Sequence, residues 1–245
     1  MNLARWLPRL TWSLVAMAII VWAGVAAPAR ADEALAKLRY PLSKSDGIRI
    51  PNIVLDLSEV PDNASAKAWG LEAKLLCEDW FPVICRFLAT EKWIPPETVR
   101  LVVKRDLDAP GVTSGATIQV SLKWITQHPE DFGMVIHELT HVIQNYPPDR
   151  TTPGWLVEGI ADYIRYWKYE PEIPRPRIDP KTATYQQGYG TTGAFLAWLV
   201  KTYDRRIILR LDAALRIKAY HPGLFQELTG KSLDILWQEF LASQP

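Results

Sequence analysis

The feature that most constrains the fold is a change of hydrophobic period in the middle of the chain. From Ala116 to Leu122 apolar and polar residues alternate, which is the period of a β-strand with one buried face. From Asp131 to Asn145 apolar residues recur at intervals of three and four, which predicts an amphipathic helix. A strand is therefore followed closely by a helix that has one apolar face to bury.

Weaker patterns on both sides extend this picture. The turn residues Pro61–Asn63 provide a helix N-cap, and the prolines between 171 and 180 indicate an extended loop. The other expected elements are strands at 49–57 and 98–103 and helices at 64–87, 154–167, 191–203, 206–219 and 232–242. Strands followed by helices are typical of an α+β fold.

Composition narrows the class of protein. The 245 residues are 48% hydrophobic, and 28 Lys and Arg stand against 27 Asp and Glu. This composition is that of a globular protein, and the length requires no more than one domain. Because no basic excess exists, a nucleic-acid partner is not expected.

The N-terminus has the features of an export signal. Arg5 and Arg9 precede an apolar run from Leu10 to Ala27, and Ala29 and Ala31 form a small-x-small cleavage pattern. We therefore expect cleavage after Ala31 and a secreted or periplasmic product without stable membrane association. A retained membrane anchor is the alternative, because the run is long enough to span a bilayer.

Three segments follow from this interpretation. Residues 1–31 are the predicted signal peptide, 32–48 a loose N-terminal segment, and 49–245 the single folded domain. Removal of the signal leaves 25 Lys and Arg against 27 Asp and Glu, a net charge of −2.

Export permits a disulfide between the two cysteines, Cys77 and Cys85. In one continuous helix their Cα atoms would lie roughly 12 Å apart, beyond the roughly 7 Å that a bridge allows. Pro82 lies between them and could break the helix there. The sequence therefore leaves two alternatives open, a disulfide between these cysteines or two buried thiols.

The chemistry of the chain is concentrated in the sequence HELTH. His137 and His141 flank Glu138, and on a helix residues four apart lie about 5–6 Å from each other on one face. Both imidazoles can then reach one metal ion, and Glu138 can hold a water molecule without being a ligand. The alternative is two histidines with a purely structural role, but a buried polar triad is costly unless something pairs it.

A catalytic metal site of this kind needs a third protein ligand. Seventeen residues after His141, the predicted helix offers Glu158 and Asp162, again four residues apart on one face. One carboxylate can complete the coordination while the other accepts a hydrogen bond from an imidazole. The spacing alone leaves open which carboxylate does which.

Longer stretches around these residues resemble a known family. VIHELTHVIQNY, PGWLVEGIADYIRYW and YQQGYGTTGAFLAWL are similar to the basic secretory protein family, a group of zinc peptidases of plants and bacteria, as is GVTSGATIQVSLKWI upstream. The resemblance covers roughly residues 50–242 and is most specific at 132–199. Despite the family's name, the mature chain here is slightly acidic.

The resemblance implies a zincin-like metallopeptidase domain with a small twisted mixed sheet. The Glu158-x-x-x-Asp162 spacing also resembles thermolysin-like zincins, in which the glutamate binds zinc. Carried onto this chain, it implies one Zn²⁺ bound by His137, His141 and Glu158, Glu138 as general base, and Asp162 as the residue that orients His137. The implied substrate is a peptide or protein.

Two further roles belong to the predicted peptide hydrolysis. Tyr189 is our candidate donor to the developing oxyanion, with Tyr185 and Tyr163 as competitors. The strand with Ala116, Ile118 and Val120 would be an open edge to which an extended substrate adds. The alternative function is a secreted binding or defence-type protein that keeps zinc with little turnover; an intact Glu138 argues against it.

Overall fold

The computed structural model describes residues 48–175 and 177–244. The predicted signal peptide, 1–31, and nearly all of the predicted segment 32–48 lie outside these residues. Within the described ranges, no helix is both long and apolar enough to cross a membrane.

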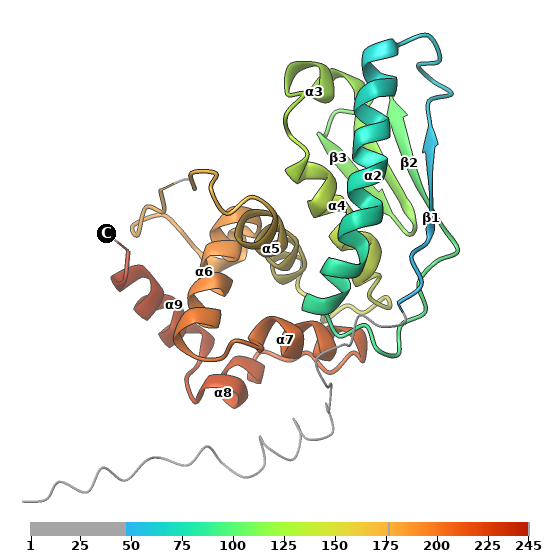
Figure 1. Ribbon diagram of the computed structural model, residues 1–245. Coiled ribbons are helices and arrows are strands. Elements are labelled where there is room, and N and C mark those ends of the chain that lie inside the picture. Colours follow the sequence, from blue (N-terminus) through green and yellow to red (C-terminus); the bar gives the residue numbers. More distant parts are fainter. Residues whose placement is uncertain (1–47, 176, 245) are drawn as a thin grey trace, which may run out of the picture.

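A small mixed sheet lies on one side of the molecule (Figure 1). The strand order is β1-β2-β4-β3; β1, β2 and β4 are parallel, and β3 runs antiparallel to β4. The bounds are β1 Asn52–Asp56, β2 Thr98–Lys104, β3 Gly111–Ser114 and β4 Thr117–Ser121. The strands expected at 49–57, 98–103 and 116–122 are thus confirmed with shifts at their ends, whereas β3 was not predicted.

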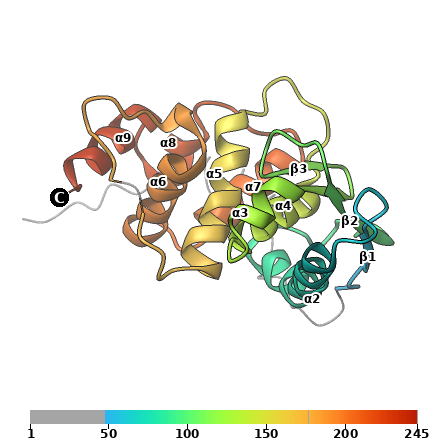
Figure 2. The same ribbon diagram turned by 90° about the horizontal axis from the view of Figure 1, so that it is seen from above.

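One face of the sheet is buried and the other is open to solvent. The helix α2 (Ala64–Phe87) packs over β1 and β2, and α4 (Gly133–Gln144) packs over β4 and β3 (Figure 2). Side chains such as Leu101, Ile118 and Val120 point toward these helices and are fully buried. The alternation seen in the sequence therefore places the apolar half of each strand against α2 and α4, which fixes where the HELTH helix lies.

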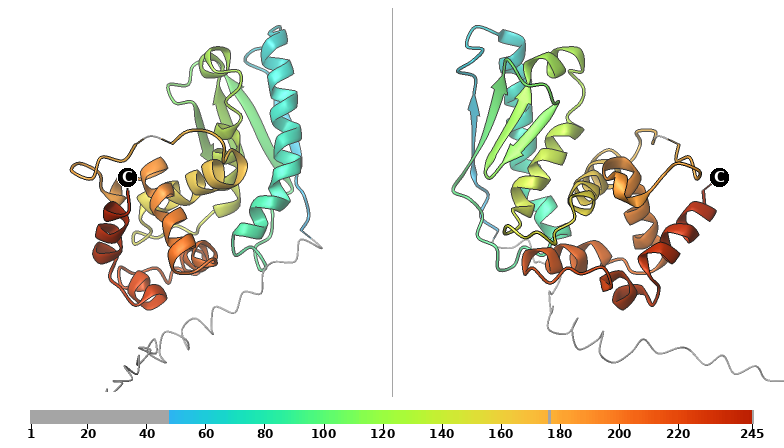
Figure 3. Two further views of the ribbon diagram at one scale, coloured as in Figure 1. Left: turned by 60° about the vertical axis from the view of Figure 1, so that its left-hand side comes forward. Right: turned by 180° about the vertical axis from the view of Figure 1, so that it is seen from behind.

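From Gly154 onward the chain is helical, and Figure 3 shows these helices as a separate layer beside the sheet and the helices that cover it. Two of these helices, α5 (Gly154–Ile164) and α6 (Tyr189–Thr202), approach each other closely where Gly159 faces Thr192. A Cβ at Gly159 would come within 2.2 Å of the Thr192 side chain. The helical layer holds α5 Gly154–Ile164, a π-helical turn at Arg165–Tyr169, a 3₁₀ turn at Tyr185–Gln187, α6 Tyr189–Thr202, α7 Ile207–Arg216, α8 Leu224–Thr229 and α9 Leu233–Ala242. The short helix α3 (Leu122–Gln127) lies with the sheet, next to α2 and β4. The α+β class with a small sheet and a helical C-terminal half is confirmed.

The prediction of an open edge at Ala116, Ile118 and Val120 was wrong. Strand β4 is paired on both sides, with β2 and with β3, so its backbone has no free row of donors and acceptors. Ile118 and Val120 are core residues. The edge of the sheet on this side is β3, because a two-residue loop after Ser114, with Gly115 at a φ of 55°, folds the chain back as a hairpin.

The two cysteines are free thiols, so the alternative of a disulfide is excluded by this fold. Helix α2 continues through Pro82 without a break, and it starts at the predicted cap, where the Asn63 side chain accepts a hydrogen bond from the Ala66 N–H. Cys77 and Cys85 are both buried in the core.

Candidate metal centre

Helix α4 presents the two histidines and Glu138 at the boundary between the sheet and the helical layer. Its apolar residues, including Val135, Leu139 and Val142, are buried in the core. His137 and Glu138 are nearly as buried, with exposed fractions of 8% and 6%. Polar side chains at this depth need partners, and each has them.

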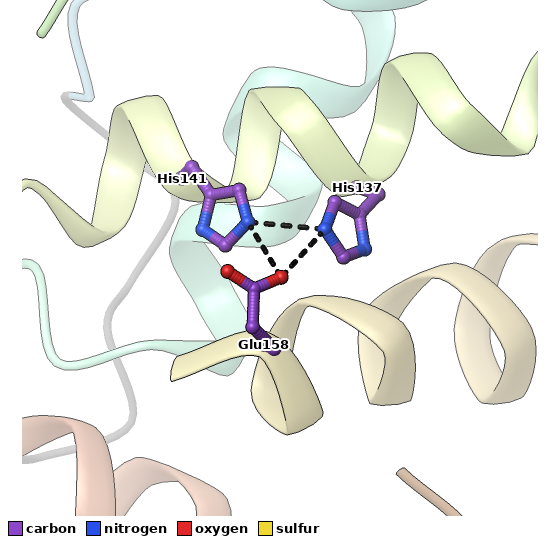
Figure 4. Close-up of side chains that lie close together, drawn as sticks. All are labelled: His137, His141 and Glu158. Atoms are coloured by element: carbon purple, nitrogen blue, oxygen red, sulfur yellow. Dashed lines mark hydrogen bonds and ion pairs between the residues drawn. The ribbon is translucent and has the colours of Figure 1, made fainter. Parts of the chain in front are cut away.

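His137, His141 and Glu158 form a compact triangle (Figure 4). The two Nε2 atoms lie 3.0 Å apart, and the Glu158 Oε2 atom lies 3.2 Å from His137 Nε2 and 3.4 Å from His141 Nε2. Ligands of a tetrahedral zinc, at about 2.0–2.1 Å from the ion, lie about 3.3 Å from each other. The three atoms therefore have the spacing that one tetrahedral metal ion requires.

The other nitrogen of each imidazole is held by an acceptor. His137 Nδ1 lies 2.6 Å from Asp162 Oδ1, and His141 Nδ1 lies 2.7 Å from Gln144 Oε1. The amide orientation of Gln144 is set because its Nε2 donates to the Val157 carbonyl. Since both acceptors can only accept, each Nδ1 carries the proton. In its neutral form each ring then directs its Nε2 lone pair into the triangle, which is the state that a metal ligand needs.

The charges around the triangle favour a cation. Burial by itself would lower the pKa of His137, but hydrogen bonds to Asp162 and Glu158 outweigh it and raise the pKa to about 9. Burial would raise the pKa of Glu158, yet its hydrogen bonds with His137 and His141 lower that pKa to about 2. Carboxylates gathered around two imidazoles thus create a negative potential, which a proton or a metal ion has to compensate.

Glu138 is held beside the triangle by the edge strand. The Thr113 hydroxyl lies 2.7 Å from Glu138 Oε2 and 3.0 Å from the Glu138 carbonyl, so its single proton can be donated to the carboxylate. Strand β3 comes this close because residue 111 is glycine: a Cβ there would lie 2.9 Å from Glu138 Cγ. The carboxylate has a fixed position in the site while remaining outside the metal triangle.

The triangle lies in a cleft of about 970 Å³ between the two layers. Residues of β3 form one wall, and Tyr189 of α6 lines another part. The Tyr189 ring stacks on that of His137, with centroids 6.1 Å apart, and its backbone has an unusual positive φ of 46°. Tyr163 is buried in the core, and Tyr185 packs against Trp155 and Trp237, so neither of these lines the cleft.

The structure brings together every residue of the predicted metal set, and it adds three that were not predicted. Gln144 had a local signal, because it follows His141 by three residues on the same helix face. Thr113 and Gly111 had none, since their role depends on where the hairpin places β3 relative to α4.

One comparison with known proteins gives a match. The family model described as BSP, peptidase of plants and bacteria, matches residues 72–240, which include the whole metal triangle. No curated protein matches the chain, and no solved structure does.

Proposed function

The chain belongs to the family of peptidases of plants and bacteria, and on that basis we propose that it is a zinc-dependent metallopeptidase. The observation that carries the metal dependence is the triangle of His137, His141 and Glu158, whose three ligand atoms lie within 4.8 Å of one another. Two nitrogens and one carboxylate oxygen are donors that suit Zn²⁺, and three protein ligands leave one position open.

The side chains around the triangle have separate roles in the proposed hydrolysis of a peptide bond. Zinc in this triangle would supply a Lewis acid that polarises the scissile carbonyl and acidifies water. Glu138 removes a proton from the attacking water as the new C–O bond forms, and it returns that proton to the nitrogen when the C–N bond breaks. Asp162 and Gln144 keep both imidazoles in the tautomer and orientation that the ligands need.

Tyr189 is proposed to stabilise the oxygen that gains negative charge. Of the three tyrosines considered, it is the one that lines the cleft, and its ring lies over His137. Its phenol can donate a hydrogen bond in the transition state. The positive φ of Tyr189 is a strained conformation for a residue with a Cβ, and such strain is common at functional sites.

The substrate backbone is proposed to lie along β3 rather than β4. Among residues 48–175 and 177–244, strand β3 pairs with β4 alone, and Gly111, Val112 and Thr113 line the cleft next to Glu138. An extended peptide can therefore add to the free edge by backbone hydrogen bonds and place its scissile bond beside the general base.

The variant Glu138→Gln tests this function. It keeps the side-chain shape and the hydrogen-bond acceptor for Thr113 but removes the base. We expect unchanged zinc content and a loss of peptide cleavage of about 10²–10⁴-fold, the range attributed to general-base catalysis. Cleavage at the wild-type rate would refute the mechanism. A wild type that binds zinc but cleaves no peptide of a broad library would favour the binding or defence-type alternative.

A further inference from the structure

A second hollow adjoins the active-site cleft on the helical layer. Its volume is about 690 Å³, and it lies between the π-turn, α6 and α9. Trp167 and Arg175 line both the cleft and this hollow. A chain that leaves the cleft on the side of Asp162 and Tyr166 can therefore continue directly into the hollow.

The charged residues that line the hollow are all cations. They are Lys168, Arg175, Arg177 and Lys201, and no Asp or Glu of residues 48–175 and 177–244 contributes to the lining. Within these residues, none of the four forms an ion pair. The neighbouring Arg165 differs, because Asp131 and Glu170 neutralise it. The four cations of the hollow thus form a concentrated positive surface in a mature chain of net charge −2.

The floor between these cations is apolar and aromatic. Trp198 and Phe240 line it, and two of the cations lie over aromatic rings. The Arg175 guanidinium is 5.0 Å from the centre of the Trp167 ring, and Lys168 Nζ is 5.1 Å from that of Tyr163. Such a surface suits a ligand that carries several carboxylates together with apolar groups.

We propose that this hollow, together with Arg175 at its junction with the cleft, is a subsite for an acidic stretch of the peptide substrate. This inference rests on the proposed peptidase function. The scissile bond lies in the cleft, and the acidic residues lie several positions away along the same chain. Attraction between the cations and these carboxylates raises kcat/KM for acidic peptides, and salt weakens the effect.

The test compares a Glu peptide and a Gln peptide, each in two placements of the variable stretch, on three forms of the full enzyme. The peptides share one cleavable sequence and differ only in a flanking stretch, which holds three Glu in one and three Gln in the other; each is made with the stretch before and after the scissile bond. The variant Arg177→Gln/Lys201→Gln removes two exposed cations. The variant Lys67→Gln/Lys123→Gln is the control, because it makes the same change of charge at exposed sites in the sheet half.

At low salt we expect the wild type and the control to have a kcat/KM about five-fold higher for the Glu peptide than for the Gln peptide. This ratio is taken for whichever placement of the stretch, before or after the scissile bond, gives the larger difference. The Arg177→Gln/Lys201→Gln variant should lose this preference while cleaving the Gln peptide at the wild-type rate. In roughly 0.5 M salt the preference of the wild type and of the control should shrink. Equal cleavage of both peptides by the wild type would overturn the subsite and leave the peptidase function intact.

A binding measurement keeps the subsite testable if no peptide is cleaved. Fluorescence anisotropy of the labelled peptides should show that the Glu138→Gln protein binds the Glu peptide more tightly than it binds the Gln peptide. Adding the Arg177→Gln/Lys201→Gln change should abolish this difference in affinity. Absence of that difference overturns the subsite. If the double variant instead weakens only binding to vesicles of anionic lipid, the hollow contacts a membrane surface and the proposal is also overturned.

Discussion

At the scale of single residues, Glu158 and Asp162 are proposed to have different tasks, because their carboxylates contact different nitrogens of His137. Glu158 Oε2 faces both Nε2 atoms, whereas Asp162 Oδ1 lies behind His137 at Nδ1. Removing a ligand costs more metal affinity than removing its orienting partner, which typically costs 10–100-fold. We therefore predict that Glu158→Ala weakens zinc binding more than Asp162→Ala, as measured by competition with a chelating dye. The reverse order would make Asp162 the ligand.

Gln144 links His141, one proposed metal ligand, to the helix that carries Glu158, another proposed ligand. It is 1% exposed, accepts from His141 Nδ1 and donates to the Val157 carbonyl, one residue before Glu158. Gln144→Met fills the same space without these bonds, so zinc affinity should fall by about 10–100-fold. The control is Gln127→Met, an exposed position at the end of α3. Equal zinc affinity of the two variants would contradict this role.

At the scale of single elements, helix α2 keeps both thiols away from solvent and from each other. Burial raises the pKa of Cys77 and of Cys85 to about 12. Because the thiolate is the reactive form, neither thiol should react with a disulfide reagent at pH 8 in the native protein. In guanidinium without reductant, two thiols per chain should react. No reaction under those conditions would indicate a disulfide and a broken α2.

The C-terminal end of α4 is anchored by a buried ion pair on α7. Arg216 donates to the Ile143 and Gln144 carbonyls and pairs with Asp212, which is fully buried and also accepts from Tyr146. Asp212→Ala leaves Arg216 buried without its acid, so it should lower the free energy of unfolding by about 3–5 kcal/mol. Urea denaturation measures this loss.

The matched control for that variant is Lys231→Met, which removes an exposed ion pair with Glu239. We expect its urea midpoint to stay at the wild-type value, because exposed pairs contribute little. If Asp212→Ala unfolds at the same midpoint as Lys231→Met, Asp212 does not anchor α4.

The elements also show where prediction from sequence succeeds and where it fails. The start of α2 at Asn63 and the placement of His137 and His141 on one face of α4 depend on residues a few positions apart, so the sequence pattern was sufficient. The four-residue strand β3 shows no clear alternation of apolar and polar residues, so the sequence did not predict it. Its pairing with β4 places β4 inside the sheet. Thr113 reaches Glu138 only through that pairing.

At the scale of the whole molecule, the metal triangle joins the two layers. Figure 1 shows α4 beside the sheet and α5 in the helical layer. The side chains proposed as ligands, His137 and His141 of α4 and Glu158 of α5, line one cleft. A ligand that binds only the native protein stabilises it by mass action. Zinc at about 100 times its dissociation constant should therefore add about 2.7 kcal/mol to the free energy of unfolding. A chelator-stripped sample with the stability of the zinc-loaded one would contradict this.

The location of the protein is a further proposal at this scale. We propose that the chain is exported and cleaved after Ala31. N-terminal sequencing of the product from an exporting host should begin at Asp32. A product that begins at Met1 and stays with the membrane fraction would favour the retained anchor.

The most direct test of the metallopeptidase is a titration of zinc into the chelator-stripped protein with peptide cleavage as the readout. Cleavage should be absent at the start, rise in proportion to added zinc and reach its plateau at one ion per chain. Cleavage that persists in the stripped protein, or that never appears at any zinc concentration, would contradict the account.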